Sequence, residues 1–525
     1  MKHHVFLFKG IRLLTGVAAT VLYLGSFACL DAQALDLDWS GQFRSENHWV
    51  FNYSITGNET KDPAKVQSNG YYAPGGGERN AYFQTLFMRL RPIVVVNDNV
   101  AIKSEWWAGD PVYGIFGNAA GLSNDQRQYY STQSRGSLIT AQRFWGEFQS
   151  DFGTVQVGRA PIHWGLGLFW NSGDGLWDRY ASTADLIRLV SKFGSFTFTP
   201  QVAKYSVGNG IGGACINAPD PTTGSYPATC TTTDPGGGGL TDYSIAFTYD
   251  NKDEDLEMGL LYVKRIAGGS QDRRTGTLGV EGQPAGSKFN HWDVYGRKKV
   301  GKFTFTGDLP IVNGDVSGID FRTWAAALEA KWQISDTWQS ELKFGRAPGQ
   351  PDYRAGTRPG IFKAYYFNPN YKIALIMFNY GLHGFAGPNT TNNPNTSPTS
   401  MASPFDNPIV NAKYAAWAGS FTTAKWTFRG NFVLAQAIET AGTSDIFFNH
   451  WTRSFAGKNP NAGVQSSFLG WETDLGATFR WDESVELGWE WGLWFPGGYY
   501  AFQNSPVGVN IDPVIASVFR VGVVF

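Results

Sequence analysis

The feature that most constrains this chain is a strict alternation of apolar and polar residues, repeated in segments of about ten to fifteen residues that end in turns. Residues 35–53 show the pattern, and residues 469–481 repeat it with Trp471 and Phe479 on one parity and Glu472 and Arg480 on the other. Successive side chains of a β-strand point to opposite faces, so each such segment predicts a strand with one apolar and one polar face. No run after residue 34 is long and apolar enough to predict a membrane-spanning helix.

The first residues have the pattern of a secretory signal peptide. Lys2, Lys9 and Arg12 form a basic start, residues 13–30 are mostly apolar, and Ala32-Gln33-Ala34 fits a cleavage site. We therefore expect residues 1–34 to be removed and residues 35–525 to form one domain. A retained transmembrane anchor is the alternative interpretation.

Alternation alone does not separate a soluble β-sandwich from a membrane barrel, because only the partner of the apolar face differs. Export, aromatic residues near the strand ends, and short turns alternating with long loops all favour the barrel. The chain also ends with Phe519, Val521, Val523 and Phe525 on the apolar parity, which resembles the assembly signal of outer-membrane barrel proteins. The fold class expected is an all-β, transmembrane, antiparallel up-and-down barrel.

Counting strands gives nineteen candidates, but termini on one side of the membrane require an even number, so we predict about eighteen strands. The segment left out is Lys372–Tyr380, which lies inside the long loop 348–407. It is expected either to enter the lumen as a constriction or to form an external hairpin. If the short turns are periplasmic and the long loops, including 207–241 and 348–407, are extracellular, both termini are periplasmic.

Two cysteines, Cys215 and Cys230, follow the predicted leader and flank a Gly-, Pro- and Thr-rich stretch. Export to an oxidising compartment favours a disulfide between them, and two free thiols are the alternative. The formal net charge of −1 gives no electrostatic attraction for nucleic acid, so nucleic-acid binding is not expected.

The polar parity is predicted to line a water-filled lumen, and charges of both signs are interleaved on it. Rings of lumen charge can select ions and polar solutes, whereas the alternative for any one residue is a cross-strand ion pair that holds the wall together. The predicted lumen residues are Arg44, Arg89, Arg91, Lys103, Glu105, Arg143, Glu147, Glu329, Lys331, Glu341, Lys343, Lys413, Lys425, Arg429, Glu472, Asp474, Arg480, Glu486, Glu490 and Arg520.

The apolar parity changes phase across Gly158-Arg159-Ala160-Pro161, which predicts a β-bulge. This bulge either turns Arg159 into the lumen or only bends the strand. Together with Trp177-Asp178-Arg179-Tyr180, Asp185 and Arg188, the Gly158-Arg159 pair resembles the alginate-export type of outer-membrane porin of Gram-negative bacteria. The resemblance covers about thirty residues. It implies an eighteen-stranded barrel and places Arg159, Arg179, Asp185 and Arg188 near the constriction of a pore.

The function expected is a channel in the cell outer membrane that passes polar or charged solutes, in one version an exporter of an oligo- or polysaccharide. An outer-membrane barrel enzyme, and an adhesin or structural barrel, are the alternatives. No HExxH or CxxC motif occurs, and no metal, cofactor or catalytic residue is expected. The expected partners are outer-membrane lipid, the solute, and the barrel-assembly machinery acting on the strand that ends at Phe525.

Overall fold

The structure, a computed structural model, describes residues 36–53, 80–109, 111, 115–116, 139–205, 240–267, 287–316, 319–350, 361–381, 405, 407–441, 446–449, 454–502 and 510–525. The predicted leader, Cys215 and Cys230, and nearly all of loop 207–241 lie outside these residues. Cleavage and the disulfide therefore stay predictions. No helix among the described residues is long and apolar enough to cross a bilayer.

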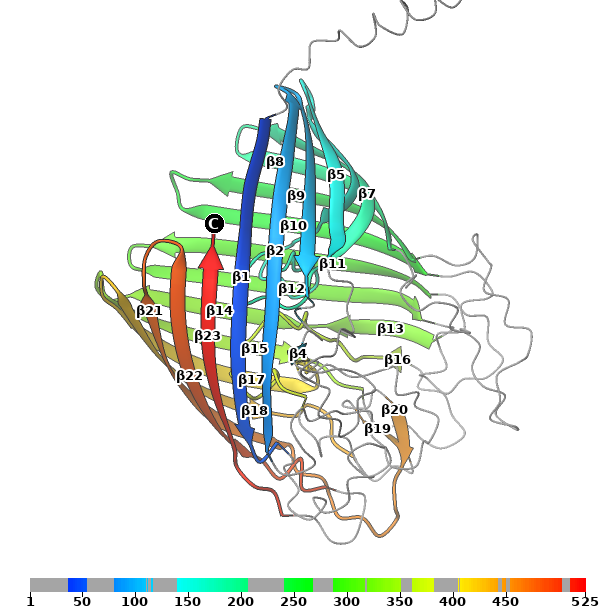
Figure 1. Cartoon of the computed structure of the whole chain (residues 1–525). Helices are drawn as coiled ribbons and strands as arrows, with labels where there is room; N and C mark the ends of the chain where they lie inside the picture. Colours follow the sequence, from blue (N-terminus) through cyan, green and yellow to red (C-terminus); the bar gives the residue numbers. More distant parts are fainter. Residues whose placement is uncertain are drawn as a thin grey trace, which may run out of the picture.

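The described elements are all β-strands, and most of them belong to one large sheet (Figure 1). In chain order they are β1 (Asp36–Phe51), β2 (Ala81–Asn97), β3 (Val100–Ala108), β4 (Ile115–Phe116), β5 (Thr140–Ser150), β6 (Gly153–Pro161), β7 (Thr183–Phe193), β8 (Phe196–Tyr205), β9 (Leu240–Asn251), β10 (Leu256–Ala267), β11 (Ser287–Val300), β12 (Phe303–Val316), β13 (Ile319–Trp324), β14 (Ala326–Gln333), β15 (Trp338–Ala347), β16 (Ile361–Phe362), β17 (Ala412–Thr422), β18 (Trp426–Gln436), β19 (Ile446–Asn449), β20 (Ser454–Gly457), β21 (Phe468–Arg480), β22 (Val485–Pro496) and β23 (Val514–Val524).

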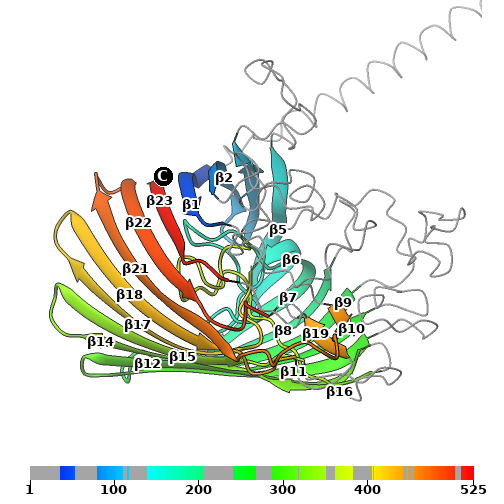
Figure 2. The ribbon, with the colours of Figure 1, turned by 90° about the horizontal axis from the view of Figure 1, so that it is seen from below.

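The sheet closes on itself, because β1 pairs antiparallel with β2 on one side and with β23 on the other. Figure 2 shows the wall running round from β1 to β23. β13 and β14 both pair with β12 and together fill one position in the wall, while β4 and β16 are two-residue additions to it. Eighteen strand positions therefore make a closed antiparallel barrel, as the alternation predicted. β19 and β20 pair only with each other.

The outer face of the wall is apolar and the inner face is polar. Trp39, Ile187 and Leu475 expose 54%, 62% and 63% of their surface on the outside. On the inside, Arg44 and Glu46 expose 1% and 0%. A closed barrel pairs its strands all the way round, so an apolar outer face of this kind suits the interior of a bilayer.

The last residue closes the seam between the first and last strands. The backbone N–H of Gly41 donates to the Phe525 carbonyl at 2.7 Å, and that of Phe525 donates to the Gly41 carbonyl at 3.0 Å. A Cβ at position 41 would lie 2.6 Å from Cζ of Phe525, so the phenyl ring covers a position that only glycine leaves open. Phe525 lies at the same rim as the start of β1 and the tight β2–β3 turn. The membrane side of this rim stays a prediction.

Two segments leave the wall and fill part of the lumen. The first inner segment, residues 162–182, follows β6, and the second, residues 363–381, follows β16 (Figure 2). Leu168, Ile376 and Tyr380 are fully buried within them. The main hydrophobic core of the described residues therefore lies inside the barrel, between these segments and the wall.

The structure differs from the sequence-based expectations at both inner segments. Lys372–Tyr380 is not a strand and lies in the lumen, so the interpretation as an external hairpin is wrong. The predicted β-bulge at 158–161 is also wrong: β6 pairs with β5 in unbroken register as far as Arg159, and with β7 as far as Pro161. The apolar parity changes because the chain leaves the wall after Pro161, not because the strand contains an extra residue.

Candidate functional site

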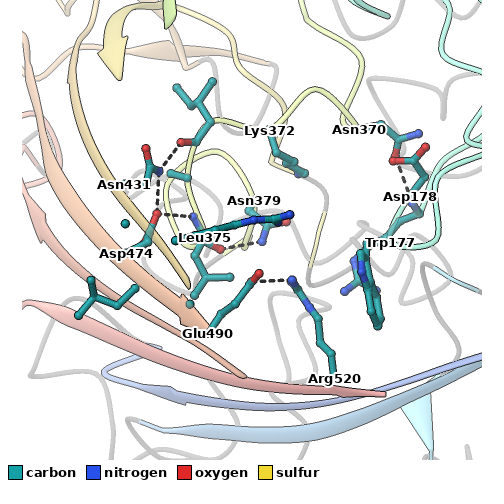
Figure 3. Close-up of a pocket in the computed structure, with 17 residues that line it drawn as sticks. Trp177, Asp178, Asn370, Lys372, Leu375, Asn379, Asn431, Asp474, Glu490 and Arg520 are labelled. Atoms are coloured by element: carbon teal, nitrogen blue, oxygen red, sulfur yellow. Dashed lines mark hydrogen bonds and ion pairs between the residues drawn. The ribbon is translucent and has the colours of Figure 1, made fainter. Parts of the chain in front are cut away.

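A cavity of about 410 Å³ lies in the lumen, where both inner segments face the wall formed by β18 and β21–β23 (Figure 3). The first inner segment contributes Trp177, Asp178 and Arg179. The second contributes Asn370, Lys372–Leu375 and Asn379, and the wall contributes Arg429–Asn431, Asp474–Gly476, Glu490 and Arg520. The lining therefore combines an indole ring, amides and charges of both signs.

A chain of ion pairs forms one side of the cavity. Arg520 on β23 contacts the Glu490 carboxylate at 2.5 Å and the Glu46 carboxylate at 3.1 Å. Arg179 of the first inner segment contacts Glu46 at 2.5 Å. Glu46 is fully buried between two guanidinium groups, so each of these charges is paired, as a buried charge requires.

Other contacts fix the first inner segment at this end. The guanidinium of Arg44 donates to the carbonyls of Leu176 and Asp178, each at 2.6 Å. The indole N–H of Trp177 donates to Glu486 at 3.0 Å, and Gly522 leaves room for the indole because a Cβ there would lie 3.1 Å from it.

A second charge cluster holds the first inner segment at Asp174, two residues before Leu176. The Glu105 carboxylate accepts from Arg91 at 2.8 Å and from Arg143 at 2.9 Å, and both arginines also contact Asp174. Burial raises the pKa of the Asp174 carboxyl, but a hydrogen bond from Ser172 and the guanidinium groups of Arg143 and Arg91 outweigh it. The net result is a pKa below the usual value, so Asp174 stays ionised.

The second inner segment is anchored by acidic side chains of β21. The Glu472 carboxylate accepts the backbone N–H groups of Ile376 and Met377, both at 2.6 Å. The Asp474 carboxylate accepts the N–H of Leu375 at 3.2 Å. A segment without regular structure leaves its N–H groups without backbone partners, and here the wall supplies them.

Aromatic hydroxyls hold the same segment at other points of the wall. The Tyr380 hydroxyl lies 2.7 Å from Nδ1 of His48, and the Tyr365 hydroxyl lies 3.1 Å from Nε2 of His291. Burial raises the pKa of both tyrosines, so their hydroxyls stay protonated. His48 on β1 is fully buried, so its ring lies in the packed interior and not in solvent.

Arg429 is the cavity charge that remains available. It lies opposite Gly476 in the β18–β21 register, and its guanidinium has no hydrogen bond or ion pair with the residues that the structure describes. By contrast, the ammonium of Lys372 donates to the Phe378 carbonyl at 3.1 Å. Arg429 can therefore offer its N–H donors to a solute in the cavity.

Most of the predicted lumen residues lie on the inner side of the wall or inside the barrel. The residues placed there are Arg44, Arg89, Arg91, Lys103, Glu105, Arg143, Glu147, Arg179, Arg188, Glu329, Lys331, Glu341, Lys343, Arg429, Glu472, Asp474, Glu486, Glu490 and Arg520, with Arg480 at the exposed end of β21. Many form the cross-strand ion pairs weighed as the alternative, including Lys103–Glu147 at 2.8 Å and Lys343–Glu329 at 2.9 Å.

Four predicted lumen residues lie elsewhere. Arg159 and Asp185 pair with each other on the outer face, in the parity of the exposed Val157 and Ile187. Lys413 is also outward, in the parity of Trp417, because Tyr414 is the residue that turns inward and contacts Tyr371. Lys425 lies in the tight turn before β18.

The sequence did not single out Asp174, Trp177 or Asp178 as contacts of the lumen, nor the tyrosines of the second inner segment as anchors. These residues lie in segments without strand periodicity, and their partners are distant in the sequence. The only local sign of these contacts in the sequence is the group of aspartate and tryptophan residues in 171–180.

No protein-family model matches the chain, and no curated protein matches it. Solved structures do resemble it along nearly its full length. OpdQ of Pseudomonas aeruginosa is 10% identical, with 93% of this chain and 98% of that chain covered and a TM-score of 0.45. A BenF-like porin from Pseudomonas fluorescens Pf-5 is 10% identical, with 93% and 99% covered and a TM-score of 0.44.

An anion-selective porin from Comamonas acidovorans is also similar, with 11% identity, 93% and 99% of the two chains covered and a TM-score of 0.38. With TM-scores below 0.5, these barrels do not superpose closely on this chain.

Proposed function

We propose that this chain is a channel of the outer membrane that passes small polar or charged solutes by passive diffusion. The observation that carries the proposal is the cavity between the inner segments and the wall, beside which the Arg429 guanidinium has no partner among the described residues. An apolar exterior that fits lipid and a charged interior that fits water are the two surfaces a barrel channel needs.

The inner segments make this channel selective rather than wide. They occupy the lumen and are held by buried ion pairs and hydrogen bonds at several points of the wall. A solute must therefore pass beside them, close to lining groups that donate and accept hydrogen bonds. Hydrogen bonds from these groups replace part of the hydration shell of a polar solute, whereas an apolar solute gains nothing from them.

Export and assembly of the chain are part of the same proposal. The signal peptide directs the chain to the periplasm, and the barrel-assembly machinery acts on the last strand. The contacts between Phe525 and Gly41 support this role of the terminus, because they complete the pairing that closes the barrel.

Single-channel recording in a planar bilayer under a salt gradient tests the proposal, with Arg429→Glu as the informative variant. The substitution changes the charge beside the cavity by two elementary charges. At about 8 Å in water this changes the energy of a monovalent ion by about 1 kcal/mol, or roughly fivefold in local concentration. We expect the reversal potential to shift toward cation selectivity.

Lys252→Glu is the matched control, because it makes the same charge change in the β9–β10 turn, where the Lys252 side chain is 85% exposed. It should leave the reversal potential unchanged. Equal shifts in the two variants would mean that Arg429 does not line the conducting path. A folded barrel without open-channel steps would contradict the proposal itself and would favour the adhesin or enzyme alternatives.

Export of a polysaccharide is the narrower version of this function. An extended polymer would need more of the lumen than the cavity offers, so at least one inner segment would have to move. Solute-flux assays with neutral oligosaccharides of increasing length test this point, since flux that stops at short oligomers would restrict the channel to small solutes.

A further inference from the structure

We propose that Trp324, Arg346 and Lys413 on the outer face form a binding site for the phosphate group of a membrane lipid. We call these three residues the outer cationic patch. The proposal rests on the outer-membrane location proposed above and is independent of conduction through the lumen.

The patch is placed by strand parity. Arg346 follows the parity of Leu342 and Phe344 on β15, which expose 43% and 48% of their surface on the outside. Lys413 follows the parity of Trp417 on β17. Both cations lie at the ends of their strands on the long-loop side, directly beyond apolar side chains that suit the bilayer interior.

The two cations lie directly opposite each other, because Arg346 pairs with Lys413 in the β15–β17 register. Opposite residues of an antiparallel pair have Cβ atoms about 5 Å apart, and like charges at that distance repel each other. An anion between or above them removes this repulsion. The arrangement is therefore most stable when an anionic group is bound.

Arg346 is held ready for such a group. Its guanidinium lies 4.0 Å from the ring centroid of Trp324, and Nη1 donates to the Trp324 carbonyl at 2.8 Å. One face and one N–H are thus fixed, and the remaining N–H groups of the planar fork are suited to phosphate oxygens. Trp324 is itself 48% exposed, and an indole ring at the level of lipid headgroups is a common interfacial anchor.

Neighbouring charges reduce the positive potential but do not cancel it. The Glu439 carboxylate interacts with Arg346, and one row further out Arg322 pairs with Asp320 at 2.7 Å. Lys413 adds a second positive charge, which has no ion pair with the described residues. Glu439 offsets the charge of Arg346, and the charge of Lys413 remains for an external anion.

Cations are absent from one stretch of this rim among the described residues. On β21, β22, β23 and β1, the outward residues at the long-loop ends are Trp471, Phe495, Ile515 and Phe51, which carry no charge. Outward cations occur elsewhere on this side of the wall, as Lys264 on β10 follows the parity of the exposed Met258 and Leu260. A lipid with acyl chains and a phosphorylated headgroup fits this arrangement, because its chains contact the apolar side chains nearer the middle of the strands and its headgroup contacts the cations at their ends.

Binding of diphosphoryl lipid A to the full-length barrel in detergent, measured by native mass spectrometry, tests the site. The Arg346→Gln/Lys413→Gln double variant should bind at least roughly tenfold more weakly than wild type, since it loses the charge-assisted hydrogen bonds to phosphate. Lys252→Gln/Lys298→Gln, which removes two exposed cations at the opposite rim, should bind as wild type. Lys413→Arg should also keep binding.

Several results would overturn the assignment. The first is that the Arg346/Lys413 double variant binds lipid A as tightly as the wild type does. The second is that the wild type binds lipid A without its phosphates as tightly as intact lipid A. The third is that millimolar inorganic phosphate displaces the lipid. The last result would identify a site for free anions instead of a lipid site. Conductance of the double variant should match that of the wild type, because the patch lies outside the lumen. If neither the wild type nor the double variant conducts, the proposed channel function is contradicted, but the lipid site is not.

Discussion

Glu472→Gln should loosen the second inner segment from the barrel wall. In the wild type, one buried carboxylate accepts two backbone N–H groups, from Ile376 and Met377, each at 2.6 Å. The glutamine side chain has one oxygen and turns an N–H₂ group toward the second donor. One buried N–H loses its acceptor and faces the amide N–H₂ instead, which costs up to about 3 kcal/mol.

A loss of that size has a measurable effect on local opening. About 3 kcal/mol corresponds to a roughly hundredfold larger population of the open segment, if the segment opens independently of the barrel. Hydrogen–deuterium exchange should therefore speed up at the amides of residues 375–377 and stay slow in β21. Single-channel records should show a larger or noisier conductance as the segment leaves the lumen.

The control is Arg480→Gln, at the exposed end of the same strand, which should change neither exchange nor conductance. Unchanged exchange at residues 375–377 in Glu472→Gln would refute the carboxylate as the anchor of this segment. Faster exchange throughout the barrel would instead mean that the substitution acts on global stability.

The two remaining predictions concern the seam. Glu46→Ala leaves the guanidinium groups of Arg179 and Arg520 without a shared partner and should destabilise the barrel by about 3–5 kcal/mol, seen as a lower temperature of heat-modified migration; an unchanged temperature would show that water replaces the carboxylate. Deleting Phe525 should lower the yield of assembled barrel more than it alters ion selectivity, because it removes the hydrogen bonds and ring contact at Gly41. A normal yield would contradict an assembly role for the terminus.

The alternation of residues was sufficient to predict the closed barrel and its strand number, because every strand must show one face to lipid. It failed where both parities are apolar. In β17, Tyr414 and Ala416 turn inward and Trp417 turns outward. Apolar residues therefore lie on both faces, and hydrophobicity did not show which face carries Lys413. The resemblance likewise placed Arg159 in the pore, whereas the unbroken register of β5 and β6 keeps it on the outer face.

The candidate site was harder to predict than the wall. Arg429, Glu490 and Arg520 could be assigned to the lumen from their parity in regular strands. The cavity itself depends on how the inner segments dock, and their contacts join residues such as Trp177 and Glu486 that are hundreds of positions apart. Periodicity carries no information on such contacts, since the inner segments have no repeat and their backbone is held by side chains of other strands.

The first inner segment also bears on the order in which the barrel assembles. Near its end, Arg179 binds Glu46 of β1, while Trp177 packs on Gly522 of β23, so this stretch spans the junction of the first and last strands from within. Its complete docking surface forms only after β23 has met β1. We therefore expect docking of residues 176–179 to be a late folding event, which then opposes reopening of the junction between the first and last strands of the barrel.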